Sequence, residues 1–247
     1  MEKKIEKHYG NAVRILMAKV NPIKKLLVKT YCTVHKYINI IAMEIIKEEG
    51  NDEEYRFFLE YVGELNKGVQ FADQDFKSTN HFYHYSEEKG LYGFSNALLE
   101  CKKYYKMAVN YAVAGDISKS VFYFGAACHL IQDTTVPHHV NNKLLKSHRA
   151  FEMWILKKLV NGYPFETAEE SKRYETIDKY IKANAIMSNN TYTKFKNISN
   201  TEINYSRISN MILPEAERTT AGFMLDFYED ILLAIKPNVI SDSTEIK

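Results

Sequence analysis

Residues 115–137 read GDISKSVFYFGAACHLIQDTTVP, and this stretch predicts one clearly bounded helix. Asp116 is a residue type that caps helix N-termini, because its carboxylate accepts hydrogen bonds from backbone N–H groups that lack an intrahelical partner. Apolar residues then recur with the helical period as far as about Gln132. Pro137 ends the segment, since the residue before a proline is pushed out of the helical region. The sequence therefore predicts a helix that begins after Asp116 and stops before Pro137.

The same capping and periodic signals recur along the rest of the chain. Further helices are predicted over residues 23–49, from Asp52 towards Gly68, from Ser95 to Gly115, and over residues 144–159 before Asn161-Gly162. Three more helical segments follow, the last from Pro214 to Ile235. Between Gly68 and Gly93 the pattern breaks down. This break predicts a long loop, and a loop of that length in a compact domain is usually functional.

The composition favours an all-helical fold. Glycine and proline number only 10 and 5 among the 247 residues. So few turn-forming residues argue against a sandwich or barrel and for long helices joined by few loops. The expected fold class is all-α, a single compact multi-helix domain of about eight or nine helices. We expect this domain to span residues 29–236, between an N-terminal extension over residues 1–28 that can form helix and a C-terminal tail over residues 237–247.

Charge and cysteine content exclude several classes of protein. Lys and Arg total 33 against 31 Asp and Glu, a net charge of +2, so the dense basic surface of a non-specific nucleic-acid binder is absent. Cys32, Cys101 and Cys128 are odd in number and form no Cys-x-x-Cys, which argues against a disulfide framework or a thiolate zinc site. No apolar run reaches about 18 residues, so no transmembrane helix is expected. Arg14 and Lys19 interrupt the most apolar N-terminal stretch, so no signal peptide is recognised and a cytoplasmic location is expected.

The histidines are clustered. Four of the eight fall within twenty residues: His129, His138, His139 and His148. His129 lies four residues before Asp133, and His148 four residues before Glu152, so each pair shares one face of a helix. Zinc accepts imidazole nitrogen and carboxylate oxygen at about 2.0–2.2 Å. Cysteine-free sets of this kind are typical of catalytic zinc sites that keep a position open for water.

Each pair also has a structural interpretation. A single His and carboxylate four residues apart is more often a surface ion pair or a histidine oriented by its neighbour. Two such pairs, joined by a turn that contains Pro137 and His139, favour a metal site instead. His84 and His138 are expected to be neighbours of this site and not ligands.

Several motifs in the chain follow the order of one known pattern. HLIQD at residues 129–133, PHHVNN at 137–142, HRAFE at 148–152, NHFY at 80–83 and TVH at 33–35 match, in part, HYxGD, PxHxxN, HxxxE, a His-Phe-Tyr/Trp element and an N-terminal histidine helix. This pattern resembles the zinc-dependent phospholipases C of Gram-positive bacteria. The resemblance covers the chain from about Lys29 to Ile235, and it suggests that the expected domain is a catalytic domain of that type.

The resemblance implies a cluster of two or three zinc ions. The first zinc would bind Asp73, His81, His129 and Asp133. The second would bind His139, His148 and Glu152. The third would bind His35 and share Asp133. The family completes this third site with an N-terminal tryptophan, whereas the single tryptophan here is Trp154.

The resemblance also implies an enzyme, a zinc metallohydrolase. The expected activity is that of a phospholipase C, which cleaves a glycerophospholipid to diacylglycerol and a phosphorylated head group, with Asp73 as a catalytic base. Tyr83 and Tyr85 are expected to contact substrate, with core packing as the alternative. The expected partner is a phospholipid met in transient contact with a membrane surface, the protein is expected to be a monomer, and no nucleic acid is expected.

Alternatives remain open for both activity and location. A single-strand nuclease of the S1/P1 type has the same fold and a similar zinc cluster. A zinc-stabilised binding protein without activity is the alternative from a different class. Secretion, as in the resembled family, is the alternative to a cytoplasmic location.

Overall fold

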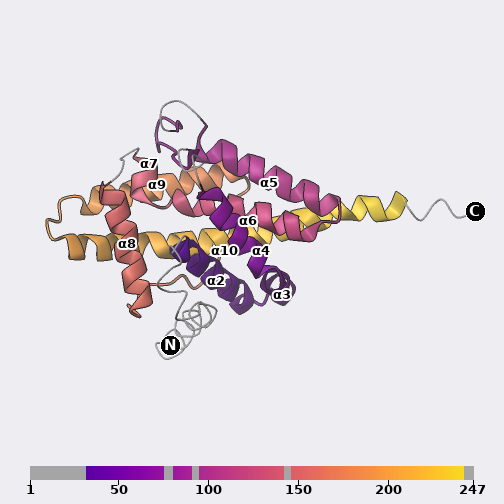
Figure 1. Cartoon of the computed structure of the whole chain (residues 1–247), viewed down its shortest axis with the longest axis horizontal. Coiled ribbons are helices and arrows are strands. Elements are labelled where there is room, and N and C mark those ends of the chain that lie inside the picture. Colours follow the sequence, from indigo (N-terminus) through magenta and orange to yellow (C-terminus); the bar gives the residue numbers. More distant parts are fainter. Residues whose placement is uncertain (1–31, 75–79, 91–94, 142–145, 242–247) are drawn as a thin grey trace, which may run out of the picture.

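The computed structural model describes residues 32–74, 80–90, 95–141 and 146–241 of the chain (Figure 1). Within these ranges it contains nine helices and no strand, which confirms the predicted all-α class. The predicted N-terminal extension lies outside the described residues. No helix in the described ranges is both long and apolar enough to span a lipid bilayer.

The helices are α2 (Thr33–Glu48), α3 (Asp52–Glu60), α4 (Val62–Ala72), α5 (Ala97–Val113), α6 (Ile117–Asp133), α7 (Pro137–Val140), α8 (Lys146–Val160), α9 (Ile177–Phe195) and α10 (Thr201–Ser241). Figure 1 shows α10 along the long axis of the molecule, with α8 lying across one end. The central helix α6 packs against α4 and α5, while α10 packs against α2 and α9.

An aromatic core joins the central helices. Phe124 of α6 stacks on Phe227 of α10, with ring centroids 4.0 Å apart and planes inclined by 8°. Phe58 of α3 lies 5.8 Å from the Phe124 ring, and all three side chains are fully buried. Aromatic residues bury a large apolar area each, so this contact contributes strongly to the packing of α6.

Two glycines let α4 and α6 meet backbone to backbone. A Cβ atom added at Gly68 would lie 1.8 Å from the carbonyl oxygen of Phe122, and one added at Gly125 would lie 2.1 Å from that of Leu65. Gly68 is therefore a packing residue inside α4, which continues to Ala72. The prediction that a loop begins at Gly68 is wrong because the glycine serves this close contact and not a helix stop.

The C-terminal third contains fewer helices than predicted. Three segments were expected after Gly162, whereas the described residues form only α9 and α10, and α10 runs through Pro214 to Ser241. A proline inside a helix removes one hydrogen bond and costs about 3 kcal/mol. Leu213 and Ala216, on either side of Pro214, are both buried. The tertiary packing of these buried residues therefore outweighs the local tendency of Pro214 to begin a new helix.

Other predicted boundaries agree with the structure or differ from it slightly. Asp116 caps α6 by accepting a hydrogen bond from the backbone N–H of Lys119. The helix predicted from Asp52 is divided at Tyr61 into α3 and α4. The chain leaves α8 through Gly162, which has a φ of +72°. At this left-handed position glycine lacks the steric cost that a side chain would bring.

Candidate metal centre

The site is built on the last turn of α6. His129 and Asp133 lie four residues apart there, and both are buried. His129 Nε2 lies 3.1 Å from Asp133 Oδ2. The capping by Asp116 and the contact at Gly125 fix this helix, so both side chains are held at a defined position beside α4.

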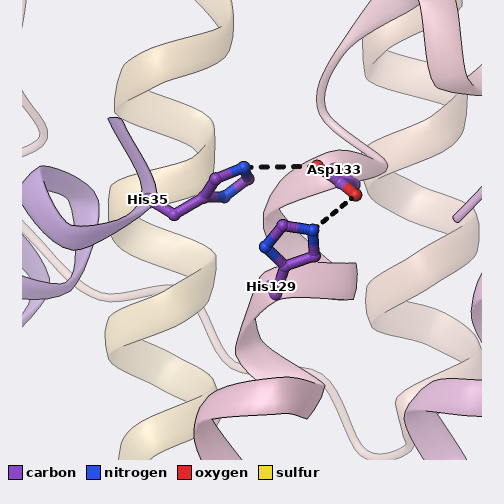
Figure 2. A group of neighbouring side chains, drawn as sticks. All are labelled: His35, His129 and Asp133. Atoms are coloured by element: carbon purple, nitrogen blue, oxygen red, sulfur yellow. Dashed lines mark ion pairs between the residues drawn. The ribbon is translucent and has the colours of Figure 1, made fainter. Parts of the chain in front are cut away.

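Four histidines surround the carboxylate of Asp133. Its Oδ2 lies 2.9 Å from His81 Nδ1 and 3.1 Å from His129 Nε2. Its Oδ1 lies 3.4 Å from His35 Nε2 and 3.8 Å from His139 Nε2. Figure 2 shows His35 and His129 directed at different oxygens of this one carboxylate. Each oxygen therefore faces two imidazole nitrogens.

These side chains come from segments that are far apart in the sequence. His35 lies in the first turn of α2, and Asp73 is the residue that ends α4. His81 follows α4 in an irregular segment, and His139 belongs to the short helix α7. The expected ligands thus converge on the end of α6 from several separate elements of the fold.

A second group lies between α7 and α8. His148 Nε2 is 2.8 Å from Glu152 Oε1 on the same face of α8. The ring of His148 meets that of His139 edge to face, with centroids 4.5 Å apart. The two helices therefore bring all three expected ligands of the second zinc together.

Within the described residues, three sets of side chains are close enough to share a metal ion. In each set one ligand atom per residue lies within 4.8 Å of the others: His35, His129 and Asp133; Asp73, His81 and His129; His139, His148 and Glu152. The second and third of these sets belong to the expected first and second zinc sites. The first set contains His35 and Asp133, as expected for a third site, and also His129.

The buried donors fit a zinc cluster. Both ring nitrogens of His139 are buried, and neither has a hydrogen-bond partner within the described ranges. Leaving a polar atom buried without a partner costs free energy, and a metal ion would remove that cost. Imidazole and carboxylate donors without thiolate match the ligands that zinc takes at open sites. Their roles as ligands remain predictions.

The surroundings of Asp133 favour its ionised carboxylate, which is the form that binds a metal ion. Burial by itself would raise the pKa of Asp133, but its electrostatic interactions with His129 and His139 outweigh burial. With the hydrogen bonds from the surrounding histidines, they hold the pKa of this carboxyl well below its ordinary value of 3.8. Asp133 is therefore ionised at neutral pH, the form in which it binds a cation.

Two of the histidines have lowered pKa values, which favour the neutral imidazole that can bind a metal ion. Burial lowers the pKa of His139 to about 3, against the attraction of Asp133. Burial, followed by the charge on His129, also lowers the pKa of His35 below its ordinary 6.5. His81 differs, because its hydrogen bond to Asp133 and the charge of that residue outweigh burial and raise its pKa.

Asp73 has a neighbour that the sequence did not reveal. Cys32 Sγ donates a hydrogen bond to Asp73 Oδ2 at 3.4 Å. Burial and the charge of Asp133 raise the pKa of Asp73 above its ordinary 3.8. Cys32 is fixed at the start of α2 in a left-handed conformation, with a φ of 60°. An odd cysteine without a second nearby in sequence gave no signal of this contact.

Gln132 is a second residue that sequence analysis missed. Its Oε1 lies 2.8 Å from His35 Nδ1, and its side chain is buried. The only available signal was a polar amide beside Asp133 in an otherwise apolar stretch. That signal does not identify a partner 97 positions away in the chain.

The neighbouring aromatic and histidine residues divide into buried and exposed groups. Tyr83 is fully buried, whereas Tyr85 exposes 36% of its surface. Of these two expected substrate contacts, only Tyr85 has its side chain at the surface. His84 accepts hydrogen bonds from Ser86 and the backbone of Glu87 and belongs to none of the three sets.

The fold and this cluster define a class, that of all-helical proteins with a cluster of histidines and carboxylates that could hold metal ions. The chain belongs to the zinc dependent phospholipase C family, whose sequence profile matches residues 34–205. No curated protein sequence matches the chain significantly.

Solved structures with the same fold include two clostridial toxins. The alpha toxin from Clostridium absonum has a TM-score of 0.66 and 17% identity, and the match covers 78% of this chain and 63% of the toxin. The alpha-toxin of Clostridium perfringens from the avian strain SWCP has a TM-score of 0.64 and 16% identity, with coverage of 78% and 62%. The chain thus spans less than two thirds of the length of these proteins. At this level of sequence identity the structural similarity establishes the shared fold alone.

Proposed function

We propose that the protein is a phospholipase C, a zinc metallohydrolase that cleaves a glycerophospholipid to diacylglycerol and a phosphorylated head group. The observation that carries this proposal is the arrangement at Asp133, where each carboxylate oxygen faces two imidazole nitrogens. Membership of the zinc dependent phospholipase C family supports it.

The proposed ligands are those expected from the sequence. Asp73, His81, His129 and Asp133 would hold one ion, His139, His148 and Glu152 a second, and His35 with Asp133 a third. Bound zinc supplies positive charge that neutralises an anionic phosphodiester, activates water as a nucleophile and stabilises the leaving alkoxide.

The side chains themselves contribute positioning and proton transfer. Asp133 holds His81 and His129 at one oxygen, which orients both rings towards a common point. Asp73 is half-buried, and its Oδ2 accepts the thiol hydrogen of Cys32, so Oδ1 is left for the proton of an attacking water.

Tyr85 would contact the lipid at the entrance of the site. Its backbone N–H donates to the carbonyl oxygen of Val140 at 3.1 Å, beside His139 in α7. Its ring is exposed, and tyrosine suits an interface that is apolar on one side and wet on the other. Tyr83, being buried, would support this segment from below.

Lipid and nucleic-acid assays in parallel test the proposal. Zinc-loaded protein is expected to release diacylglycerol from phosphatidylcholine vesicles and to leave single-stranded DNA intact. A chelator should abolish the release, and added zinc should restore it. Cleavage of DNA but not lipid would support the S1/P1 alternative, and zinc binding without either reaction would support a binding protein.

A further inference from the structure

The amide of Gln132 links the metal centre to the protein core. Its Oε1 lies 2.8 Å from His35 Nδ1, while His35 Nε2 faces Asp133 Oδ1 at 3.4 Å. The two nitrogens of this imidazole therefore point in different directions, one to the expected metal site and the other to Gln132. The partner of the second nitrogen decides which nitrogen carries the proton.

An amide can present either its oxygen or its NH₂ group, so its orientation needs a cause. Gln132 Nε2 donates to Asn39 Oδ1 at 2.8 Å and to Thr220 Oγ1 at 3.2 Å. Asn39 is oriented in turn, since its Nδ2 donates to Asn66 Oδ1 at 3.1 Å. Two acceptors thus occupy the NH₂ group of Gln132, and its oxygen is the atom left to face His35.

At His81, a second histidine of the cluster, a backbone carbonyl group takes the place of the amide side chain. His81 Nε2 lies 3.0 Å from the backbone carbonyl oxygen of Ala72. A carbonyl oxygen only accepts hydrogen bonds, so Nε2 of His81 carries a proton, while Nδ1 lies 2.9 Å from Asp133 Oδ2 and 3.2 Å from His129 Nε2. At His35 the acceptor is a side-chain amide, which accepts the proton of Nδ1 only if its oxygen is fixed towards the ring.

We infer that Gln132 is a positioning residue, which holds His35 protonated at Nδ1 and keeps Nε2 as a free ligand atom. The alternative tautomer would place a proton on Nε2 and direct it at Asp133 Oδ1. That hydrogen bond would occupy the ring nitrogen and the carboxylate oxygen that a shared ion requires. The inference about metal binding rests on the proposed function, whereas the inference about the proton position does not.

Variants of Gln132 and its partner on α10 test this role. Gln132→Met keeps the length of the side chain and removes every hydrogen bond. Thr220→Val keeps nearly the same shape and removes one acceptor of the amide. Asn184→Leu is the matched control: Asn184 is also a buried amide, and it donates to the Ile131 carbonyl and to Thr219 Oγ1 but is not a partner of His35.

The first measurement is the nitrogen NMR spectrum of the His35 ring in chelated protein, assigned with a His35→Asn variant. The wild-type protein and Asn184→Leu should carry the proton on Nδ1, and Gln132→Met should lose this preference. The second measurement is a zinc titration. Gln132→Met should weaken the zinc bound by His35 by about 10–100-fold, Thr220→Val should weaken it less, and Asn184→Leu should leave it unchanged.

A wild-type proton on Nε2 would overturn the inference, as would native zinc affinity in Gln132→Met. Should Gln132→Met not fold, Thr220→Val decides in its place, and an unchanged affinity there overturns the inference. The lipid assay separates this result from the proposed function. A protein with the expected tautomer and zinc losses that hydrolyses no lipid would refute the activity but retain the positioning role.

Discussion

His129 and Asp133 stand one helical turn apart on α6, and 3.1 Å separates His129 Nε2 from Asp133 Oδ2. The other oxygen of Asp133 turns the opposite way, towards His35 on α2. The carboxylate is ionised because its interactions with the surrounding histidines, His129 first among them, hold its pKa well below the ordinary value against the effect of burial. It therefore occupies the position from which one residue can serve two cations.

Asp133→Asn should abolish lipid hydrolysis and remove more than one zinc ion. Asparagine keeps the shape of the side chain but offers a single neutral oxygen, so a bridge between two cations is lost. Metal analysis and the vesicle assay measure both effects. Asp116→Asn, at the other end of α6, is the control, since asparagine caps a helix about as well as aspartate. Normal zinc content and turnover in Asp133→Asn would show that the carboxylate bridges nothing.

His148→Ala and Glu152→Ala should each remove most of the second zinc. Because metal binding stabilises the folded state, the melting temperature should fall in both variants and should recover in part with excess zinc. Calorimetry over a range of zinc concentrations measures this. His84→Ala, which removes a histidine outside the three sets, should show neither effect. Equal zinc dependence in the control would place the second ion elsewhere.

Tyr85→Ser should reduce activity on lipid vesicles more than activity on a soluble short-chain ester. The reason is that its exposed ring can enter the lipid surface, a contact that a soluble substrate does not need. Tyr83→Phe is the control, because it removes a buried hydroxyl that has no hydrogen-bond partner in the described residues. The control should keep both activities. Equal losses on both substrates in Tyr85→Ser would indicate a structural role.

Gly68→Ala should destabilise the protein by about 1–3 kcal/mol or more and weaken zinc binding. The added methyl group would meet the Phe122 carbonyl oxygen at 1.8 Å and force α4 away from α6. Gly63→Ala lies on the same helix with nothing within 4 Å of its Cβ, so it should stabilise by up to about 1 kcal/mol. Urea denaturation of the two variants gives both values. The same sign in both would contradict the packing role of Gly68.

Glu217→Gln should alter how stability depends on pH. Glu217 is fully buried, and burial raises its pKa well above 4.5, although it accepts a hydrogen bond from the Ala168 backbone N–H at 2.9 Å. The unfolded chain ionises near 4.5, so the folded state is favoured most below that pH and loses stability as the pH rises towards the folded pKa. The glutamine variant cannot ionise. It should exceed wild type in stability at pH 8, and the excess should shrink towards pH 4.

Urea denaturation at the two pH values, with equal zinc, measures this difference between the proteins. The hydrogen bond to Ala168 survives in the variant because an amide oxygen replaces a carboxyl oxygen. A constant difference across the pH range would mean that Glu217 ionises alike in the folded and unfolded chain.

The sequence predicts those helices whose ends carry a local signal. Asp116 caps α6 and Gly162 follows α8, as their residue types indicate. Gly68 and Pro214 carry equally strong local signals that tertiary packing overrides. The Phe122 carbonyl and the buried face of α10 lie far away in the sequence, so no local pattern could indicate them.

The candidate site shows the same division. The pairs His129 with Asp133 and His148 with Glu152 follow from helical spacing alone. His35 is 97 positions from Gln132, and its approach to α6 follows from no spacing rule. Its place in the predicted site came from the family resemblance. Neither helical spacing nor the family resemblance indicated Gln132, since its function depends on its contacts and glutamine is not one of the expected metal-ligand residues.

The glycine contact between α4 and α6 determines whether this candidate metal centre could be transferred to another protein. Asp73 ends α4, and His129 follows Gly125 by one turn, so the separation of these two donors is set where the helix backbones touch. The distance between packed helices depends on the side chains at their contact. A designer who copied only the histidines and carboxylates onto another helical scaffold would reproduce the list of donors but not their spacing. Gly68 and Gly125 would therefore have to be transferred together with the ligands.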